Sequence, residues 1–143
     1  MKYTTHSKNQ RQSPRARINT NASGEKAERL AEQFLSERGL ILQVRNFSRP
    51  CGEIDLIMRD GECIVFVEVR KRAPGNRVSA CESVDRRKQN RLIKTAQWYL
   101  QSSKLLDRYP CRFDVIAIGA KATQEQELEN SEIVWIKDAF NHY

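Results

Sequence analysis

The stretch GEIDLIMRDGECIVFVEVR, at residues 52–70, decides the fold. Two runs rich in apolar and β-branched residues, 53–59 and 62–70, are joined at Asp60-Gly61, and such a dipeptide between alternating runs is a strong signal for a two-residue hairpin loop. Because side chains alternate along a strand, one face of the predicted hairpin is wholly apolar. That face consists of Ile54, Leu56, Met58, Val65, Val67 and Val69. Its burial fixes the register of the two strands, so the fold is predicted to be built around a sheet.

The opposite face of this hairpin is apolar near the loop and acidic at its far end. With Asp60 and Gly61 as the loop, Asp55 and Glu68 are diagonal neighbours, roughly 7–8 Å apart at Cα. Like charges at this spacing destabilise a sheet unless a cation holds them together. Mg²⁺ fits, because it takes hard oxygen ligands, commonly one or two carboxylates with waters and substrate phosphates. The alternative is that the acids lie on a solvated face and pair with Arg70 and nearby cations.

One helix is predicted before the hairpin and one after it. Residues 24–38 carry apolar side chains at the i, i+3, i+4 spacing of an amphipathic helix. At 100° per residue, Glu28 borders the apolar stripe and is predicted to reach over the sheet toward the two acids. Residues 85–101 form the second amphipathic helix, on which Lys88 and Gln89 lie close to the packing face. Both helices are therefore expected to bring polar side chains to the acidic end of the hairpin.

Three further strands complete the predicted sheet, at 40–47, 112–118 and 132–137, and residues 73–83 form a loop. The resulting order is α-β-β-β-α-β-β. This order predicts an α/β fold in the sense of a mixed α+β sheet with helices packed on it. At 143 residues, the chain is long enough for one hydrophobic core and too short for two.

Positive charge is distributed unevenly along the chain. Lys and Arg total 25 against 18 Asp and Glu, a net charge of +7, so a polyanion such as nucleic acid is a reasonable partner. Residues 1–22 contain five cations and no acid, and their polar composition predicts a flexible basic arm before a single domain at 23–143. Within that nearly balanced domain, residues 70–94 combine nine cations with two acids. This stretch is predicted to bind the phosphate backbone of a nucleic acid.

Other kinds of site and location find little support in the sequence. No apolar run approaches the roughly 20 residues of a membrane span, so we do not expect the chain to bind or cross a membrane. The N-terminus lacks the apolar stretch of a secretory signal, so the cytoplasm is the expected location. The four cysteines form no CxxC pair and both histidines lie near the termini, which argues against structural zinc. The thiols are expected to be reduced and partly buried.

Several motifs resemble those of the YraN family of uncharacterised bacterial proteins, from about residue 23 to the C-terminus. They are GEIDLI (52–57), FVEVRKR (66–72), the helix start at 24–28, RKQNRL (87–92), RFDV (112–115) and WIKDAF (135–140). That family resembles the restriction-endonuclease-like PD-(D/E)XK superfamily and is close to archaeal Holliday junction resolvases. The resemblance implies a restriction-endonuclease-like core with metal-binding acids on adjacent strands.

The resemblance also implies roles for individual residues. Asp55 matches the metal-binding aspartate of the superfamily and Glu68 the acid on the next strand, with the backbone carbonyl of Val69 as a further ligand. Glu28 matches the helix acid of the resolvases and would support the metal directly or through water. Mg²⁺ or Mn²⁺ is the implied cofactor. The implied catalytic set is Glu28, Asp55, Glu68, Arg70 and Lys88.

This sequence departs from the superfamily pattern at the lysine that usually follows the second acid, because Arg70 stands there. A lysine at that position helps to orient or activate the attacking water and stabilises charge in the transition state. Arginine keeps the charge and binds phosphate bidentately, but it is effectively never neutral and cannot act as a base. Lys71 has the wrong strand parity, whereas Lys88 is placed to supply an ammonium from the helix. The departure bears on turnover more than on binding of metal or DNA.

Three functions remain open on these observations. The first is a Mg²⁺-dependent, structure-selective DNA endonuclease whose substrates include branched DNA. The second keeps the fold and nucleic-acid binding but lacks catalysis, as a binding module or scaffold in DNA maintenance. The third is a protein-interaction domain with a solvated acidic face. A homodimer is a further expected partner, since the fold relatives often dimerise. The predicted nucleic-acid contacts are Arg70, Lys71, Arg72, Arg86, Arg87, Lys88, Gln89 and Arg91.

Overall fold

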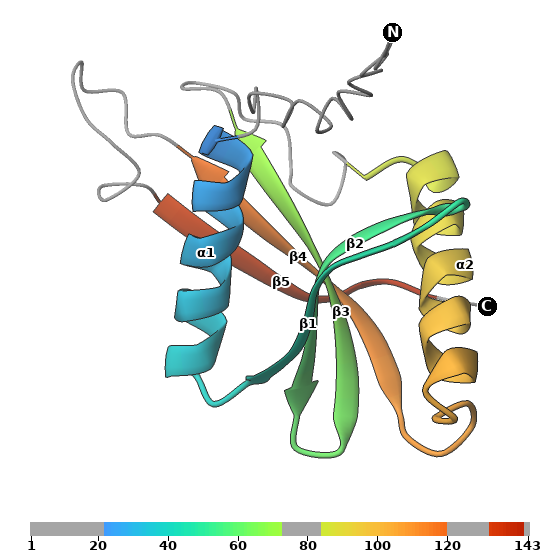
Figure 1. The fold of residues 1–143 in the computed structure, drawn as a ribbon. Coiled ribbons are helices and arrows are strands. Elements are labelled where there is room, and N and C mark those ends of the chain that lie inside the picture. Colours follow the sequence, from blue (N-terminus) through green and yellow to red (C-terminus); the bar gives the residue numbers. More distant parts are fainter. Residues whose placement is uncertain (1–21, 73–83, 120–131, 142–143) are drawn as a thin grey trace, which may run out of the picture.

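A computed structural model describes residues 22–72, 84–119 and 132–141 (Figure 1). The elements are α1 (Ala22–Glu37), β1 (Ile41–Arg49), β2 (Gly52–Asp60), β3 (Cys63–Arg72), α2 (Arg86–Ser102), β4 (Cys111–Gly119) and β5 (Glu132–Phe140). The predicted order α-β-β-β-α-β-β and the mixed α+β class are confirmed. The predicted arm at 1–22, apart from the first residue of α1, and the predicted loop at 73–83 lie outside the described residues. No helix among the described residues is long and apolar enough to cross a membrane.

The five strands form one mixed sheet in which their spatial order equals their order in the chain. All neighbouring strands are antiparallel except β3 and β4, which are parallel. A parallel pair needs a crossover connection, and α2 provides it between these two strands. Figure 1 shows α1 and α2 on opposite sides of the sheet, with both helices beginning at the upper end of the view, toward which β3 runs. This arrangement places both helix N-termini at one end of the sheet.

Each helix covers its own hydrophobic cluster, so the central strands are buried on both faces. Ala27, Ala31 and Leu35 of α1 pack with residues of the sheet that include Val65 and Val67. On the other face, the cluster under α2 is built around the following residues: Leu92, Ala96, Tyr99, Phe66 and Phe113. Burying apolar surface on both faces stabilises the sheet by roughly 25 cal/mol per Å² removed from water. The apolar stripes predicted for the two helices therefore form the core.

The hairpin loop lies one residue further along the chain than the sequence pattern predicted. Asp60 pairs with Cys63, so the two loop residues are Gly61 and Glu62 rather than Asp60 and Gly61. The physical reason is the backbone at Gly61, whose φ of 59° suits the first loop position of a primed turn, where glycine is favoured. Each paired residue of β2 thus lies opposite the residue of β3 that is two positions further along than predicted. A shift of two positions leaves the paired side chains on their predicted faces of the hairpin. The ladder ends at Leu56–Val67, so Asp55 has no paired residue on β3, and its side chain accepts a hydrogen bond from the Val69 backbone N–H instead.

The predicted apolar face of the hairpin is wrong at Ile54. Ile54 packs in the cluster under α2, whereas Leu56, two residues later, packs under α1. Regular alternation would put both on one face, so β2 turns over at Asp55. On the adjacent strand, Asn46 has a φ of 51°, a left-handed conformation that asparagine tolerates better than most residues. The irregularity at Asn46 and Asp55 gives the Asp55 side chain a direction that a flat hairpin would not.

The tip of the β1–β2 hairpin bends over α2 (Figure 1). Cys51 Sγ lies 3.4 Å from Thr95 Oγ1, and a Cβ atom at Gly52 would lie 3.0 Å from the same oxygen. Glycine at position 52 thus permits the close approach of the strand to the helix. The described cysteines, Cys51, Cys63 and Cys111, are free and partly buried, as predicted, and Cys81 lies outside the described residues.

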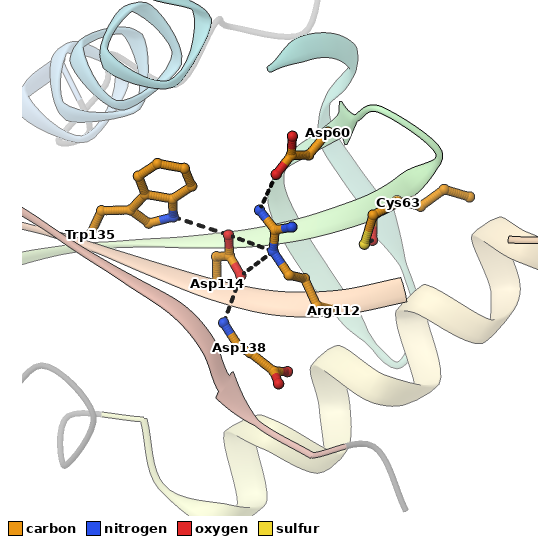
Figure 2. A network of polar contacts seen from close by, with 7 residues as sticks. Asp60, Cys63, Arg112, Asp114, Trp135 and Asp138 are labelled. Carbon is orange, nitrogen blue, oxygen red and sulfur yellow. Dashed lines mark hydrogen bonds and ion pairs between the residues drawn. The ribbon is translucent and has the colours of Figure 1, made fainter. Parts of the chain in front are cut away.

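A polar network around the buried carboxylate of Asp114 joins β5 to β4 (Figure 2). Asp114 is 0% exposed and accepts hydrogen bonds from Arg112 Nε at 3.1 Å, Trp135 Nε1 at 3.0 Å and the Asp138 backbone N–H at 2.9 Å. Arg112 also forms an ion pair with Asp60 at 2.9 Å. Buried carboxylates are tolerated when donors satisfy them in this way. The RFDV and WIKDAF motifs therefore meet in a structural network.

Candidate active site

Every member of the predicted catalytic set lines one open cavity of about 400 Å³. The five residues come from four elements: Glu28 from α1, Asp55 from β2, Glu68 and Arg70 from β3, and Lys88 from α2. The cavity lies where the N-terminal turns of both helices approach the end of β3. Residues far apart in the chain thus meet at a single pocket of mixed charge.

Asp55 is held in this pocket by the neighbouring strand. Its Oδ2 accepts a hydrogen bond of 2.8 Å from the backbone N–H of Val69. Burial, the negative charge of Glu68 and that of Glu28 together raise the pKa of Asp55 to about 8, although the Val69 N–H and Lys88 act in the opposite direction. In the metal-free chain, burial and the neighbouring acids therefore favour the protonated form of Asp55 more than in an ordinary aspartate. A cation bound beside it would favour the ionised form.

Glu68 is almost fully buried, at 4% exposed, and two cations face it. Lys88 Nζ lies 2.8 Å from its Oε1, and Arg70 Nε lies 3.5 Å from the same oxygen. The Asp85 side chain accepts from the backbone N–H of Lys88 at 2.8 Å, which caps α2 and fixes the start of the helix. An ammonium from α2 thus stands beside the second acid, as the sequence predicted for Lys88.

Arg70 is oriented toward the cavity with one donor unused. Its Nε is buried and makes no hydrogen bond to any described residue, because the contact with Glu68 lacks hydrogen-bond geometry. Arginine donors pair well with phosphate or carboxylate oxygens. Arg70 thus pairs only loosely with Glu68, and its guanidinium adds a positive charge to the lining of the cavity.

Asn46 is a site residue that the sequence analysis missed. With its amide nitrogen facing the acids, it donates to Glu28 Oε2 at 3.0 Å and to Glu53 Oε1 at 3.2 Å. Burial raises the pKa of Glu28, Asn46 lowers it, and the charge of Glu53 raises it again. The available signal was an asparagine, a poor strand former, inside the strand pattern around VRNF. Asn46 bridges the two acids at the edge of the site.

The predicted nucleic-acid contacts divide into two groups. The main cavity is lined by Arg70, Lys71 and Lys88. An adjoining cavity of about 150 Å³ is lined by Arg91 together with Asp55 and Glu68. The others line neither cavity: Arg72, Arg86, Arg87 and Gln89. The Gln89 amide donates instead to the Val84 carbonyl at 2.9 Å. Its contact is with the protein backbone at the start of α2.

The donor set suits a hard divalent cation bound by few protein ligands. Within the described part of the chain, no group of three His, Cys, Asp or Glu side chains could hold a metal ion. Mg²⁺ commonly uses only one or two carboxylates, with waters and substrate phosphates completing its octahedron. Asp55 and Glu68, with the Val69 carbonyl, fit this requirement, and a role for Glu28 is then expected through water. The absence of sulfur or imidazole in this set argues against a soft-metal site.

Comparison with known families gives an independent result. The model of the family described as "Uncharacterised protein family UPF0102" matches residues 27–118. This chain belongs to the UPF0102 family. The sequence-based resemblance to the YraN family, which is this family, is thereby confirmed. All five members of the predicted catalytic set fall inside the matched range.

Several bacterial UPF0102 proteins are similar to this chain over nearly their whole length. One from Stutzerimonas stutzeri is 48% identical over 83% of this chain and 94% of its own. One from Nitrosococcus oceani is 48% identical over 82% and 90%, and one from Pseudomonas syringae is 44% identical over 83% and 93%. Their names give the family and no activity. Metal binding and nuclease activity therefore remain proposals for this UPF0102 chain.

Proposed function

We propose that this protein is a Mg²⁺-dependent endonuclease that hydrolyses phosphodiester bonds of DNA at Asp55 and Glu68. The observation that carries the proposal is the position of Lys88, whose ammonium lies 2.8 Å from Glu68 in the cavity that Asp55 and Arg70 also line. A pair of acids, an ammonium and a guanidinium in one pocket supply the groups that phosphoryl transfer requires. Lys88 would also supply the ammonium of the usual lysine, which Arg70 replaces and which arginine cannot provide as a base.

Each side chain has a separate part in the proposed reaction. Asp55 and Glu68, with the Val69 carbonyl, would hold Mg²⁺. When bound, the metal would lower the pKa of an attacking water and neutralise negative charge on the phosphoryl group. Lys88 places a positive charge next to the same group, and Arg70 can bind two phosphate oxygens through its fork of donors. In the hydrolysis a water oxygen bonds to phosphorus, one P–O ester bond breaks, and a proton passes to the departing oxygen.

The test is a cleavage assay on branched, flap and linear DNA with Mg²⁺ or Mn²⁺. Asp55→Asn and Glu68→Gln are each expected to reduce cleavage by more than about 100-fold, since each removes a metal ligand. Glu62→Gln is the matched control, because Glu62 is an exposed acid in the hairpin loop. Cleavage that survives unchanged in Asp55→Asn comes from a contaminant and overturns the proposal.

A second candidate is a DNA-binding protein of the same fold without cleavage. Arg70 at the position of the usual lysine and the lack of a three-acid cluster among the described residues favour it. Arg70→Lys distinguishes the two candidates. If that variant cleaves DNA and the natural chain does not, the binding function is supported and the endonuclease proposal fails for the natural chain.

A further inference from the structure

The exposed face of α2 carries a row of four side chains, Arg87, Arg91, Lys94 and Trp98. Their spacing of i, i+4, i+7 and i+11 puts them within about 60° of arc on the helix. Trp98 is 53% exposed. The core-facing side of the helix is formed by other residues: Leu92, Thr95, Ala96, Tyr99 and Leu100. Packing of the fold thus does not account for a tryptophan in this row.

The row is strongly positive and largely free of internal partners. The sequence of α2 contains five cations and no acid. Of these cations, only Lys88 forms an ion pair with a described residue, whereas Arg87, Arg91 and Lys94 form none within the described part of the chain. Lone cations in a line are the complement of a phosphate backbone rather than of an apolar protein surface.

The row begins at the candidate active site and leads away from it. Arg87 adjoins Lys88, and Arg91 lines the smaller cavity together with Asp55 and Glu68. Trp98 is ten residues beyond Lys88, which corresponds to about 15 Å along a helix. That distance is roughly four nucleotides at the rise of a duplex strand and fewer for an extended strand. A strand held at the acids therefore has the reach to pass the cations and arrive at Trp98.

We infer that this row, the α2 track (Arg87, Arg91, Lys94 and Trp98), binds a single-stranded DNA segment continuing from the phosphate at the active site, with one unpaired base stacked on Trp98. An exposed aromatic ring offers a stacking platform for any base. A base inside a duplex is already stacked and paired, so only an unpaired one can reach the ring. The inference rests on the proposed function and names its substrate class: DNA with a single-stranded extension beside the cut, as in a flap or an open branch.

Binding without metal tests the track separately from cleavage. Labelled oligo-dT is titrated by anisotropy in EDTA, and tryptophan fluorescence is recorded in parallel. Stacking on one aromatic residue strengthens binding about 5- to 150-fold, so Trp98→Ala is expected to weaken binding by that factor. Trp98→Phe keeps a stacking ring and is expected to bind within a few-fold of the natural chain. A base stacked on Trp98 is expected to quench its fluorescence, and this quenching is expected to be lost in Trp98→Phe, since Trp135 is the only tryptophan left.

Two controls separate base stacking from charge and from general surface effects. An abasic strand of equal length is expected to bind the natural chain as weakly as oligo-dT binds Trp98→Ala. Leu106→Ala, at another exposed apolar residue, is expected to change nothing. Equal binding of oligo-dT by Trp98→Ala and the natural chain, or equal binding of abasic and normal strands, overturns the inference. So does a Trp98-dependent increase in mass without DNA, which would assign the row to a second copy of the chain.

The two proposals fail in different ways. A chain that binds oligo-dT through Trp98 but cleaves nothing keeps the α2 track and loses the endonuclease function. A chain that cleaves in an Asp55-dependent manner, with no contribution from Trp98 on any substrate, keeps the endonuclease function and loses the track.

Discussion

At the scale of single residues, Asp55 is a carboxyl group whose pKa lies far above that of a surface carboxylate. Its pKa is raised to about 8 from an ordinary value of 3.8, mainly by burial and by Glu68. Between these pH values the folded chain binds a proton that the unfolded chain has released. The contribution of Asp55 is therefore fully present below the unfolded pKa and is lost as the pH rises through the folded one. The acids of the site weaken the metal-free fold at alkaline pH.

Asp55→Asn is expected to remove this pH dependence. Asparagine keeps an oxygen for the Val69 N–H but carries no charge, so the variant is expected to be more stable than the natural chain by about 1–3 kcal/mol above roughly pH 8. The advantage is expected to shrink as the pH falls to about 3, below the unfolded pKa of 3.8, where the natural Asp55 is neutral before unfolding and mostly neutral after it. Urea unfolding measured across this range, without metal, gives the difference at each pH.

Glu62→Gln, in the exposed hairpin loop, is the control for removal of one negative charge. It is expected to show no rise in relative stability with pH. If Asp55→Asn is equally or less stable than the natural chain at every pH, the site does not strain Asp55, and the electrostatic account of the acidic pair is wrong.

At the scale of the elements, the sequence predicted what depends on periodicity. Apolar spacing of two and of about 3.6 residues identified each strand and helix within the described ranges, and strand parity placed Asp55 and Glu68 near each other. The loop position could not be read in this way, because both Asp60-Gly61 and Gly61-Glu62 keep the same faces. The burial of Ile54 under α2 and the bridging by Asn46 depend on a local left-handed backbone. Periodicity assumes a regular strand and so carries no information about such a turn.

The structural role of Asp114 could likewise not be predicted from the sequence, in which this residue is only part of the RFDV motif. In the folded chain, its carboxylate on β4 accepts hydrogen bonds from Arg112 of the same strand and from two donors of β5. Asp114→Ala is expected to lower the free energy of unfolding by about 3–5 kcal/mol, because it removes the acceptor of Arg112 Nε and of the two β5 donors and leaves Asp60 as the remaining acidic partner of Arg112. Urea unfolding at neutral pH measures this decrease.

Glu132→Gln is the matched control for Asp114→Ala, because Glu132 is an exposed acid on β5. It is expected to change stability by less than about 0.5 kcal/mol. A decrease below about 1 kcal/mol in Asp114→Ala would mean that water replaces the carboxylate at little cost, and that the network does not secure β5.

At the scale of the whole molecule, most of the net positive charge comes from residues outside the candidate site. Of the net charge of +7, residues 1–22 contribute +5, and the remaining domain is close to balanced. The acids that would hold a metal lie at the sheet end where both helices begin (Figure 1). A nuclease that must approach a polyanion with an acidic site benefits from cations outside that site. Under the proposed function, the basic N-terminal residues and the α2 track would supply affinity for DNA, and the cavity would supply the catalytic groups.

Neutralising the five cations of residues 1–22, each replaced by glutamine, tests this division of roles. Removing one cation from a phosphate lowers the slope of log affinity against log salt by about 0.7–0.9, so the slope is expected to change by about four if all five cations bind DNA. The weakening is expected to be equal for linear and flap DNA, because backbone contacts carry no information about strand structure.

Trp98→Ala, by contrast, is expected to weaken flap binding selectively and to leave the salt slope unchanged, since stacking displaces no counterion. Anisotropy titrations at several salt concentrations measure both effects. An unchanged slope in the glutamine variant would show that the cations of residues 1–22 do not contact DNA phosphates. The net charge of the chain would then not predict its affinity for DNA, and the α2 track would have to provide that affinity alone.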